Sequence, residues 1–523
     1  MNERINEVTI VGGGSAGWIM ALVLTTLLNR ADKDRFKFTV IESPRIPIIG
    51  VGEGTVTGFS RLLRELQIPE KNFMINSDAT FKCAGRFVGW NLDSAGKPIT
   101  FYNPFIDSGY VDGIESYYYF HKYGAGGRNL IEATQPTIEM VENCLSPKRA
   151  SSRPYEAIVP YTYHLNAAAF SEQLAGIAKQ RGVHYIQDEM QDVELDERGF
   201  VSALQLEKTG RYPVQFVIDC TGFRGSILQK ALAEPFLDYS KHLLVDRAIP
   251  MPVPHIDPDR IHPCTTATAL SGGWMFGVPL QSRMGTGYIY SSAFKSDDQA
   301  WDELKATLGD RVPADAEPRV IHMNIGRVRN TWVKNCVAAG LSAGFVEPLE
   351  ATAIYSIEQT ARNLSFYFPE FGINDHVVSR FNEVMDLQYK EILDFIVMMY
   401  YTSNRTEPFW RAAREDIVVP DTLLENLELW KHYLPSLHDV PGRFLFNAWN
   451  YYYILAGKGY FDKDHYPGEG MLRKKPWENK LQQVETQKLD LLNQLSSHRD
   501  YLNSLQQPEV QNKASFSMNY QNS

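Results

Sequence analysis

The chain has 523 residues, of which 44% are hydrophobic and 12% aromatic, and its formal net charge is −10. This acidic balance argues against nucleic acid or an anionic membrane surface as the main partner. No apolar run reaches membrane-spanning length and no signal peptide precedes the first strand, so a cytoplasmic location is expected. The five cysteines include no C-x-x-C pair and the twelve histidines no H-E-x-x-H pattern, so neither disulfides nor a metal site is expected.

The N-terminal segment has the pattern of a βαβ unit. Residues 8–11 predict a buried strand, 12–17 a turn and 18–28 a helix. A second strand over residues 36–41 ends on Glu42. This order predicts an α/β fold that opens with a parallel sheet.

The turn after the first strand fits the dinucleotide fingerprint G-x-G-x-x-G, with Gly12, Gly13, Gly14, Ser15, Ala16 and Gly17 in that order. Gly12 allows the tight turn, Gly14 lets a pyrophosphate approach the backbone, and Gly17 permits close packing of helix on sheet. The helix N-terminus, with Ser15 and Ala16, offers N–H groups to the phosphates. Glu42 is placed to accept hydrogen bonds from ribose hydroxyls. A glycine turn without a ligand is the alternative, and the fingerprint alone does not separate FAD from NAD.

Two later segments separate those cofactors. After a helix over residues 166–180 and strands around 184–195 and 201–207, an apolar strand at 217–222 ends on a small-residue turn, and a similar strand at 335–344 enters a glycine-bearing turn. This layout is similar to the FAD-binding fold of flavoprotein monooxygenases, a Rossmann-type α/β fold. The resemblance favours FAD, and it implies that further cofactor contacts come from Met190, Gly340, Leu341 and Ile354.

The C-terminal third is mostly helical and aromatic in pattern. A heptad-like run, interrupted by Lys488 and His498, lasts under four heptads and predicts one amphipathic helix packed on the body rather than a coiled coil. Its apolar positions are Leu481, Val484, Leu491, Leu495, Leu502 and Leu505. We therefore expect a FAD-binding and catalytic body over residues 1–363, a mainly helical substrate-side part over 364–506, and a polar, disordered tail over 507–523.

Four segments, in order, resemble the signatures of flavin-dependent halogenases, the tryptophan-halogenase family. The second FAD signature is matched by Glu42-Ser43-Pro44 with Ile49-Gly50-Val51-Gly52-Glu53-Gly54-Thr55, and the catalytic-lysine segment by Phe81-Lys82. The W-x-W-x-I-P signature is matched by residues 273–279, and the segment with the essential glutamate by residues 345–352. The matches run from residue 8 to about 460. The chain departs from the family at Phe276 for Trp, Val278 for Ile, Ala351 for Ser and Ala353 for Gly.

The resemblance assigns roles to these residues. In the family, reduced FAD and O2 convert a halide into hypohalous acid, which passes to the lysine. Lys82 would activate this oxidant through a hydrogen bond or a transient haloamine, and Glu350 would stabilise the positive charge on the attacked ring or remove its proton. Thr352 and Ala353 would offer N–H groups to the halide. The cofactor contacts would include Gly52, Glu53 and Gly54, and the segment separating flavin from substrate would comprise Trp274, Phe276, Val278 and Pro279.

Structural alternatives exist for these residues. Taken alone, Lys82 fits a solvated lysine in an apolar run better than a catalytic group, and Glu350 fits equally well an acid favoured by the dipole of a helix N-terminus. For Trp274 and Phe276 the alternative is ordinary core packing. The co-occurrence of the four segments favours the catalytic interpretation.

An aromatic sandwich is the expected way to hold an electron-rich ring. By resemblance, Phe105 forms one wall and Trp449 the other, while Asn103 stands where relatives that act on free tryptophan carry a ring-stacking histidine. Residues 441–453 contain no carboxylate to bind the ammonium group of an amino acid. These departures favour indole, a substituted indole or another electron-rich aromatic, free or within a larger molecule.

A FAD-dependent aromatic hydroxylase is the nearest alternative, and a non-catalytic FAD-binding protein is a second. The sequence has no second dinucleotide fingerprint for NAD(P)H, so FADH2 is expected from a separate flavin reductase, with chloride or bromide as the halide. The preferred halide, the regioselectivity and the oligomeric state are not readable from the sequence.

Overall fold

A computed structural model describes residues 4–46, 52–440, 442–461 and 466–506. The chain opens with strand β1 (Glu7–Val11), helix α1 (Ser15–Leu28) and strand β2 (Lys37–Glu42), so the predicted βαβ unit is confirmed. The helix begins at Ser15 rather than at residue 18, because only Gly12 to Gly14 are needed to turn the chain.

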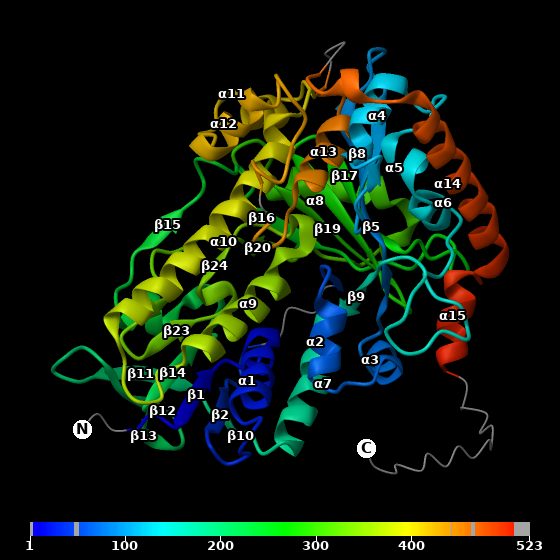
Figure 1. Ribbon diagram of the computed structural model, residues 1–523. Helices are drawn as coiled ribbons and strands as arrows, with labels where there is room; N and C mark the ends of the chain where they lie inside the picture. The colour runs from blue at the N-terminus through cyan, green and yellow to red at the C-terminus, as the bar shows by residue number, and fades with distance from the viewer. Residues whose placement is uncertain (1–3, 47–51, 441, 462–465, 507–523) are drawn as a thin grey trace, which may run out of the picture.

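A six-stranded sheet carries this unit, in the order β10-β2-β1-β14-β23-β22. All neighbours pair in parallel except β22 with β23. The other strands are β10 (His184–Gln187), β14 (Phe216–Asp219), β22 (Trp332–Val333) and β23 (Cys336–Ala338). Helix α1 is buried continuously from Gly17 to Leu24, because it packs between α7 (Ala167–Gln180) and α9 (Thr352–Tyr367). These elements form the lower part of Figure 1.

A seven-stranded mixed sheet forms the upper part of the molecule (Figure 1). Its order is β20-β16-β19-β18-β17-β5-β6, with β5 and β17 parallel and the other pairs antiparallel. The strands are β5 (Ala84–Leu92), β6 (Pro98–Pro104), β16 (Arg247–Pro250), β17 (Cys264–Leu270), β18 (Gly273–Pro279), β19 (Met284–Tyr290) and β20 (Ile321–His322).

A small sheet, β3-β9-β4, connects the two large sheets. Strand β3 (Gly52–Gly54) contacts β18 and β19, and β4 (Thr80–Lys82) contacts β17. Both pair with β9 (Thr162–Asn166). The remaining strands are β7 (Tyr110–Val111), β8 (Ile114–Glu115), β11 (Met190–Leu195), β12 (Val201–Leu206), β13 (Gly210–Pro213), β15 (Phe236–Asp238), β21 (Gly326–Val328) and β24 (Gly344–Phe345).

Helices dominate the chain after α9, as predicted. They are α10 (Asp375–Tyr401), α11 (Pro408–Glu415), α12 (Asp421–Leu429), α13 (Ala448–Gly457), α14 (Lys474–Gln494) and α15 (His498–Leu505). The earlier helices are α2 (Phe59–Glu65), α3 (Glu70–Asn76), α4 (Ser116–Tyr123), α5 (Leu130–Thr134), α6 (Thr137–Glu142) and α8 (Asp297–Leu308). The proposed boundary at residue 363 falls inside α9, and the division of the chain there stays a prediction. Residues 507–523 lie outside the described residues.

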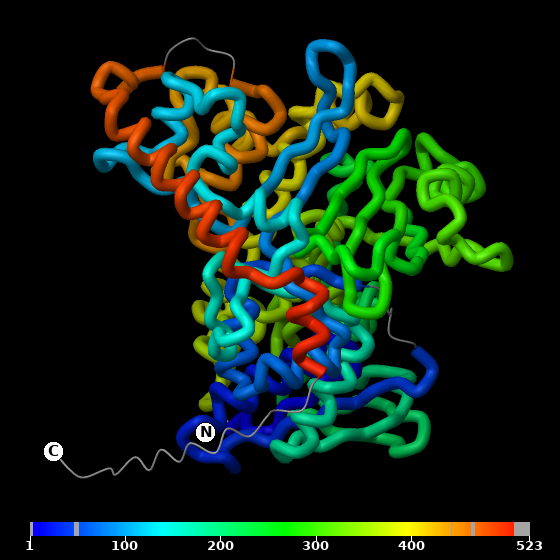
Figure 2. The backbone as a smooth tube through the Cα atoms, turned by 90° about the vertical axis from the view of Figure 1, so that its right-hand side faces the viewer, coloured from blue at the N-terminus to red at the C-terminus, as the bar shows by residue number. Residues whose placement is uncertain are grey.

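The prediction of one helix for the heptad-like run is wrong, because α14 and α15 are separate helices. The chain breaks at residues 495–497, where Ser497 forms an isolated bridge with Leu145 and accepts a hydrogen bond from the N–H of Asp500 as the cap of α15. Figure 2 shows the two helices in red along one face of the molecule. His498, at the start of α15, is fully buried and accepts a hydrogen bond from the N–H of Phe81 in β4.

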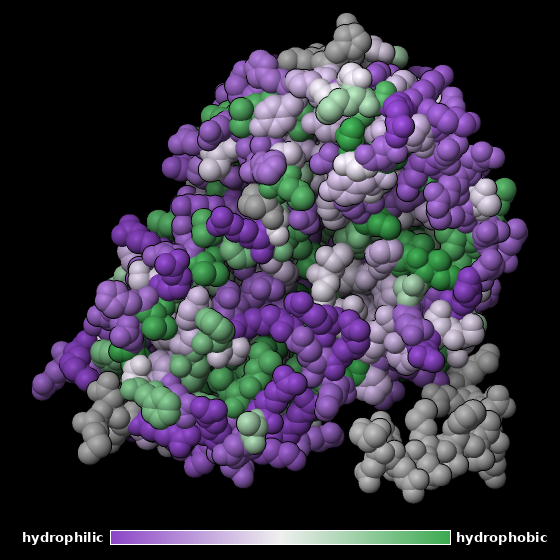
Figure 3. Space-filling model, viewed as in Figure 1, coloured by the Kyte–Doolittle hydropathy of each residue, from purple (hydrophilic) through white to green (hydrophobic). Residues whose placement is uncertain are grey.

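None of the described helices combines the length and the apolarity needed to cross a bilayer. Figure 3 shows hydrophilic residues over most of one face, with hydrophobic residues exposed around a hollow near its middle.

Candidate active site

The glycine turn after β1 is held by contacts that only glycine permits. Gly12 has φ +122°, and a Cβ on it would lie 2.2 Å from the carbonyl oxygen of Cys220. A Cβ on Gly17 would lie 1.8 Å from the oxygen of Gly12. At Gly14, by contrast, a Cβ would meet no atom within 4 Å. Gly12 and Gly17 are therefore required by the fold, whereas Gly14 leaves open space in front of the N-terminus of α1.

This difference gives a testable prediction. Gly17→Ala should lower the free energy of unfolding of the FAD-free protein by about 3 kcal/mol, because its methyl group overlaps the Gly12 carbonyl. Gly14→Ala should leave that stability unchanged and weaken FAD binding at least tenfold, because its methyl group fills the space a pyrophosphate needs. Thermal unfolding of the FAD-free protein and fluorescence titration with FAD measure the two effects. Equal loss of FAD affinity in both variants, with unchanged stability, would contradict this assignment.

A second glycine turn closes on the first. Gly340 has φ +67°, and a Cβ on it would lie 2.8 Å from the Cβ of Ala16. Glu42 approaches the glycine turn because Gly13 lacks a side chain, and its Oε2 accepts a hydrogen bond of 2.8 Å from the hydroxyl of Tyr185. The two turns and Glu42 thus border one space at the carboxyl ends of parallel strands, where α/β sheets bind nucleotides.

A cavity of about 460 Å³ occupies this space and extends to Lys82. The predicted FAD contacts that line it are Gly12, Gly14, Ser15, Ala16, Glu42, Gly52, Glu53, Gly54, Met190, Gly340, Leu341 and Ile354. Gly17 is not among them, because it packs against Gly12 instead. Residues 49–51 of the second FAD signature lie outside the described residues. The open turn, the helix N-terminus and the length of the lined surface all fit a dinucleotide.

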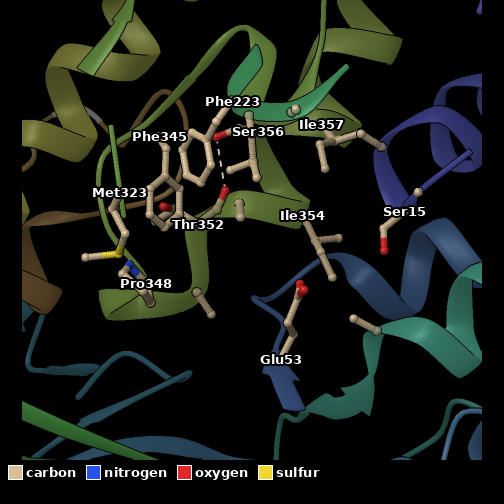
Figure 4. A pocket seen from close by; sticks show the side chains of 18 of the residues that line it. Ser15, Glu53, Phe223, Met323, Phe345, Pro348, Thr352, Ile354, Ser356 and Ile357 are labelled. Atoms are coloured by element: carbon tan, nitrogen blue, oxygen red, sulfur yellow. Dashed lines mark hydrogen bonds between the residues drawn. The ribbon is translucent and has the colours of Figure 1, made fainter. Parts of the chain in front are cut away.

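Glu53 projects its carboxylate into this cavity, opposite Ile354 and below the aromatic pair Phe223 and Phe345 (Figure 4). Burial raises the pKa of Glu53 to about 7. Ser15 lies on the other side of the same space, on α1, and Thr352 and Ser356 mark the first turn of α9. The floor of the cavity therefore carries a carboxyl group that is partly protonated near neutral pH.

Lys82 ends β4 and is only 1% exposed, so it is not a solvated surface lysine. Its Nζ donates a hydrogen bond of 3.1 Å to the carbonyl oxygen of Thr55 and lies 5.4 Å from the centre of the Phe105 ring. Burial lowers the pKa of Lys82 to about 8, against the opposing effect of the Glu350 charge. An amine with this pKa is present in both protonation states near neutral pH.

Glu350 lies just before α9 in a strained backbone. Its φ and ψ are 62° and 10°, and Ala351 follows with 56° and 43°, a left-handed pair that costs roughly 1–2 kcal/mol per residue. Burial raises the pKa of Glu350, whereas the charge of Lys82 and a hydrogen bond from Asn103 lower it. A Cβ on Gly54 would lie 3.2 Å both from the Nζ of Lys82 and from the Cβ of Ala351. The lysine and the glutamate-bearing segment therefore meet at Gly54.

The segment that matches W-x-W-x-I-P forms strand β18. Because side chains alternate along a strand, Trp274, Phe276 and Val278 share one face, and all three are buried and line the cavity. Val278 also contacts β3, since a Cβ on Gly52 would lie 3.1 Å from its Cγ1. Pro279 is not a cavity residue; its carbonyl oxygen accepts a hydrogen bond from the Thr80 hydroxyl.

None of the predicted substrate residues, Phe105, Asn103 and Trp449, is among the residues that line this cavity. Phe105 contacts Lys82 as described, and Trp449 lies on α13 with its ring 5.8 Å from that of Tyr453. Asn103 is 2% exposed, and its side chain contacts Glu350 and Asn450. The sequence assigns no site role to Gly85 or Asn450, and it names Thr55 only as the last residue of the second FAD signature. No local signal reveals them, because Asn450 meets Asn103 across 347 positions of chain.

The halide-binding candidates, Thr352 and Ala353, begin the 16-residue helix α9 and line the same cavity. The first N–H groups of a helix have no partner within it and carry partial positive charge, which suits an anion. Within the described ranges, no group of three or more His, Cys, Asp or Glu side chains is arranged to hold a metal.

Over residues 7–473 the sequence matches the family described as Tryptophan halogenase. The chain belongs to the tryptophan halogenase family. Tryptophan 6-halogenase ThaL of Streptomyces albogriseolus is 33% identical over 496 residues, which cover 89% of this chain and 92% of that protein. Tryptophan 7-halogenase RebH of Lentzea aerocolonigenes is 32% identical, over 88% of this chain and 90% of that protein. The solved structure of Tar14, a tryptophan C-6 flavin-dependent halogenase (chlorinase) from taromycin biosynthesis, matches with a TM-score of 0.89 and 33% identity, covering 96% of this chain and all of that one.

Membership of the tryptophan halogenase family confirms the predicted fold class, enzyme class and cofactors. The chain is a flavin-dependent halogenase, an oxidoreductase that halogenates an aromatic substrate with FADH2 from a separate flavin reductase and a halide. An aromatic hydroxylase and a non-catalytic FAD protein are not favoured by these relatives.

Proposed function

We propose that Lys82 and Glu350 are the catalytic pair of this halogenase and that its substrate is indole, a substituted indole or a related electron-rich aromatic. The observation that carries this proposal is the convergence of a buried lysine, Lys82, and a half-buried glutamate, Glu350, on one cavity that extends to the glycine turns. Burying two ionisable groups is costly unless they are paired or used.

Reduced FAD, when bound, supplies with O2 the oxidation of the halide to hypohalous acid. The residues proposed to hold it are those of the two glycine turns and of strand β3. The halide would rest against the N–H groups of Thr352 and Ala353 at the start of α9. Trp274, Phe276 and Val278, which share one face of β18, would keep the substrate from the cofactor, together with Pro279 at the end of the strand.

The halogen is then transferred to the ring. The hypohalous acid gives its halogen to a ring carbon, the ring loses a proton, and water is the second product. Lys82 would activate the oxidant, through a hydrogen bond from the protonated amine or a haloamine of the neutral one, and its pKa of about 8 supplies both forms. Glu350 would stabilise the cationic ring or accept its proton.

The preference for indole over free tryptophan rests on two features of the proposed substrate residues and of helix α13. Helix α13, which bears Trp449, contains no carboxylate for an ammonium group. The amide of Asn103 is occupied by Glu350 and Asn450. Phe105 and Trp449 are proposed as the walls that hold the ring. We also propose a cytoplasmic location and the division into a catalytic body over 1–363 and a helical substrate-side part over 364–506.

The test is an assay with a flavin reductase, FAD, NADH, either chloride or bromide, and a panel of indoles, phenols and free tryptophan. We expect products with the isotope pattern of the added halide, formed faster from indoles than from tryptophan. Hydroxylated products of the same mass with either salt would contradict the halogenation chemistry. Faster turnover of free tryptophan would overturn the substrate preference alone.

A further inference from the structure

Three side chains from distant parts of the sequence form a line of hydrogen bonds that ends on Glu350. The Nδ2 of Asn103, in β6, donates to the Oε1 of Glu350 at 3.0 Å. The Nδ2 of Asn450, in α13, donates to the Oδ1 of Asn103 at 2.9 Å. Both asparagines are buried, at 2% and 5% exposure, so water does not compete for these bonds.

The orientation of both asparagine amides is set by a backbone hydrogen bond at the Asn450 end of this line. The backbone N–H of Asn447 donates to the Oδ1 of Asn450 at 2.9 Å. A backbone N–H can only donate, so this bond fixes which end of the Asn450 amide is oxygen. Asn450 must then present its NH2 group to Asn103, and Asn103 must in turn present its own NH2 group to Glu350. An amide that could otherwise flip is thereby held as a donor.

The backbone around Glu350 is shaped for the same contact. Asn103 pairs with Gly85 across β5 and β6, and a Cβ on Gly85 would lie 3.7 Å from the Oε1 of Glu350. The carboxylate therefore rests over a glycine, beside the strand that supplies its donor. Because the Oε1 of Glu350 accepts the hydrogen bond from Asn103, its Oε2 is the oxygen that can face a substrate.

We propose that Asn103 and Asn450 are positioning residues that hold Glu350 as an oriented carboxylate and connect it to the helix bearing Trp449. The inference rests on the proposed role of Glu350. Trp449 precedes Asn450 on α13, so the helix that carries a proposed substrate wall also carries the end of this line of hydrogen bonds.

The groups that act on Glu350 come from several elements. Lys82 on β4 and the donor on β6 favour its charged form, whereas burial opposes it. Glu347, three residues earlier, accepts hydrogen bonds from the Tyr400 hydroxyl, and burial raises its pKa to about 8, so it adds little charge at neutral pH. Removal of the Asn103 donor should therefore raise the pH at which Glu350 ionises.

The experiment compares four variants of the full chain with one control variant. In Asn103→Ala we expect the acid limb of the kcat profile to move up by roughly one pH unit. Asn103→Asp keeps the shape and the acceptor for Asn450 but faces Glu350 with oxygen, so its shift should be larger. Asn450→Ala should shift the acid limb less than Asn103→Ala does. The double variant, with both substitutions, should show the same shift as Asn103→Ala alone. Asn91→Ala is the matched control, since Asn91 is equally buried and donates to backbone carbonyls of Thr402 and Lys458.

A second readout does not depend on activity. Infrared titration of protein carrying 13C-labelled glutamate, with Glu350→Gln as the assignment, reports the ionisation of Glu350 directly in the FAD-free protein. We expect the same order of shifts, with none in Asn91→Ala even if its melting temperature falls. An unchanged Glu350 titration in both Asn103 variants would overturn the proposal. Shifted titration in a protein that yields no halogenated product would leave the positioning role intact and refute the proposed function instead.

Discussion

Lys82→Ala is expected to abolish halogenation, with a loss on the order of 10³-fold or more, while FAD still binds. The Nζ of Lys82 is buried, donates only to the Thr55 carbonyl among the hydrogen bonds described, and lies over Phe105. No other described lysine lines the cavity, so no neighbour can replace it as carrier of the oxidant. Product formation by liquid chromatography and FAD binding by fluorescence are the two measurements.

The control for this variant is Lys458→Met. Lys458 is also buried, its Nζ donates to the Met399 carbonyl and the Thr402 hydroxyl, and burial lowers its pKa strongly. It lies after α13 and does not line the cavity. We expect Lys458→Met to keep its halogenation rate within about twofold. Halogenated product from Lys82→Ala at a comparable rate would remove Lys82 from the chemistry.

Glu350→Gln should reduce the halogenation rate by about 10²–10³-fold, since that is the usual effect of removing one electrostatic partner of a transition state. Glutamine keeps the size of the side chain but can neither carry negative charge nor take the ring proton. Because the left-handed backbone at residues 350 and 351 is unchanged, the variant should fold normally. Single-turnover rates with preformed FADH2 and an indole substrate measure the loss.

Glu347→Gln is the matched control for Glu350→Gln. Its carboxyl group is buried against the Tyr400 hydroxyl, and its pKa of about 8 means that it is mostly protonated at pH 7. Glutamine resembles that protonated state, so the rate should change by about twofold or less. A similar loss in both variants would indicate that general disruption of this segment, rather than the charge of Glu350, slows the reaction.

Local patterns in the sequence were sufficient to predict the fold class and the family. The glycine turn lies within six consecutive residues, and strands such as β1 and β14 are continuous apolar runs that are visible in the sequence. The burial of Lys82 was not decided by its sequence neighbours, which also allow a solvated lysine, and only the structure shows it. The proposed roles of the site residues remain predictions, because measurements of product formation, FAD binding and ionisation are what test them.

Long-range contacts were not predictable in this way. The break between α14 and α15 depends on a bridge from Ser497 to Leu145, and nothing in the heptad spacing indicates it. Asn103 stands where some relatives carry a ring-stacking histidine, and nothing in the sequence indicates that its amide bonds to Asn450 and Glu350. Each of these contacts joins residues that become neighbours only after the whole chain has folded.

The bond between Phe81 and His498 has a consequence for how the enzyme is made. His498 holds its Nδ1 against the Ile261 carbonyl and receives the N–H of Phe81 at Nε2, and burial lowers its pKa to about 3, so acidification within the physiological range does not release it. The ribosome adds this histidine 417 residues after Phe81. A nascent or truncated chain that ends before residue 498 therefore lacks this contact with the strand that carries Lys82.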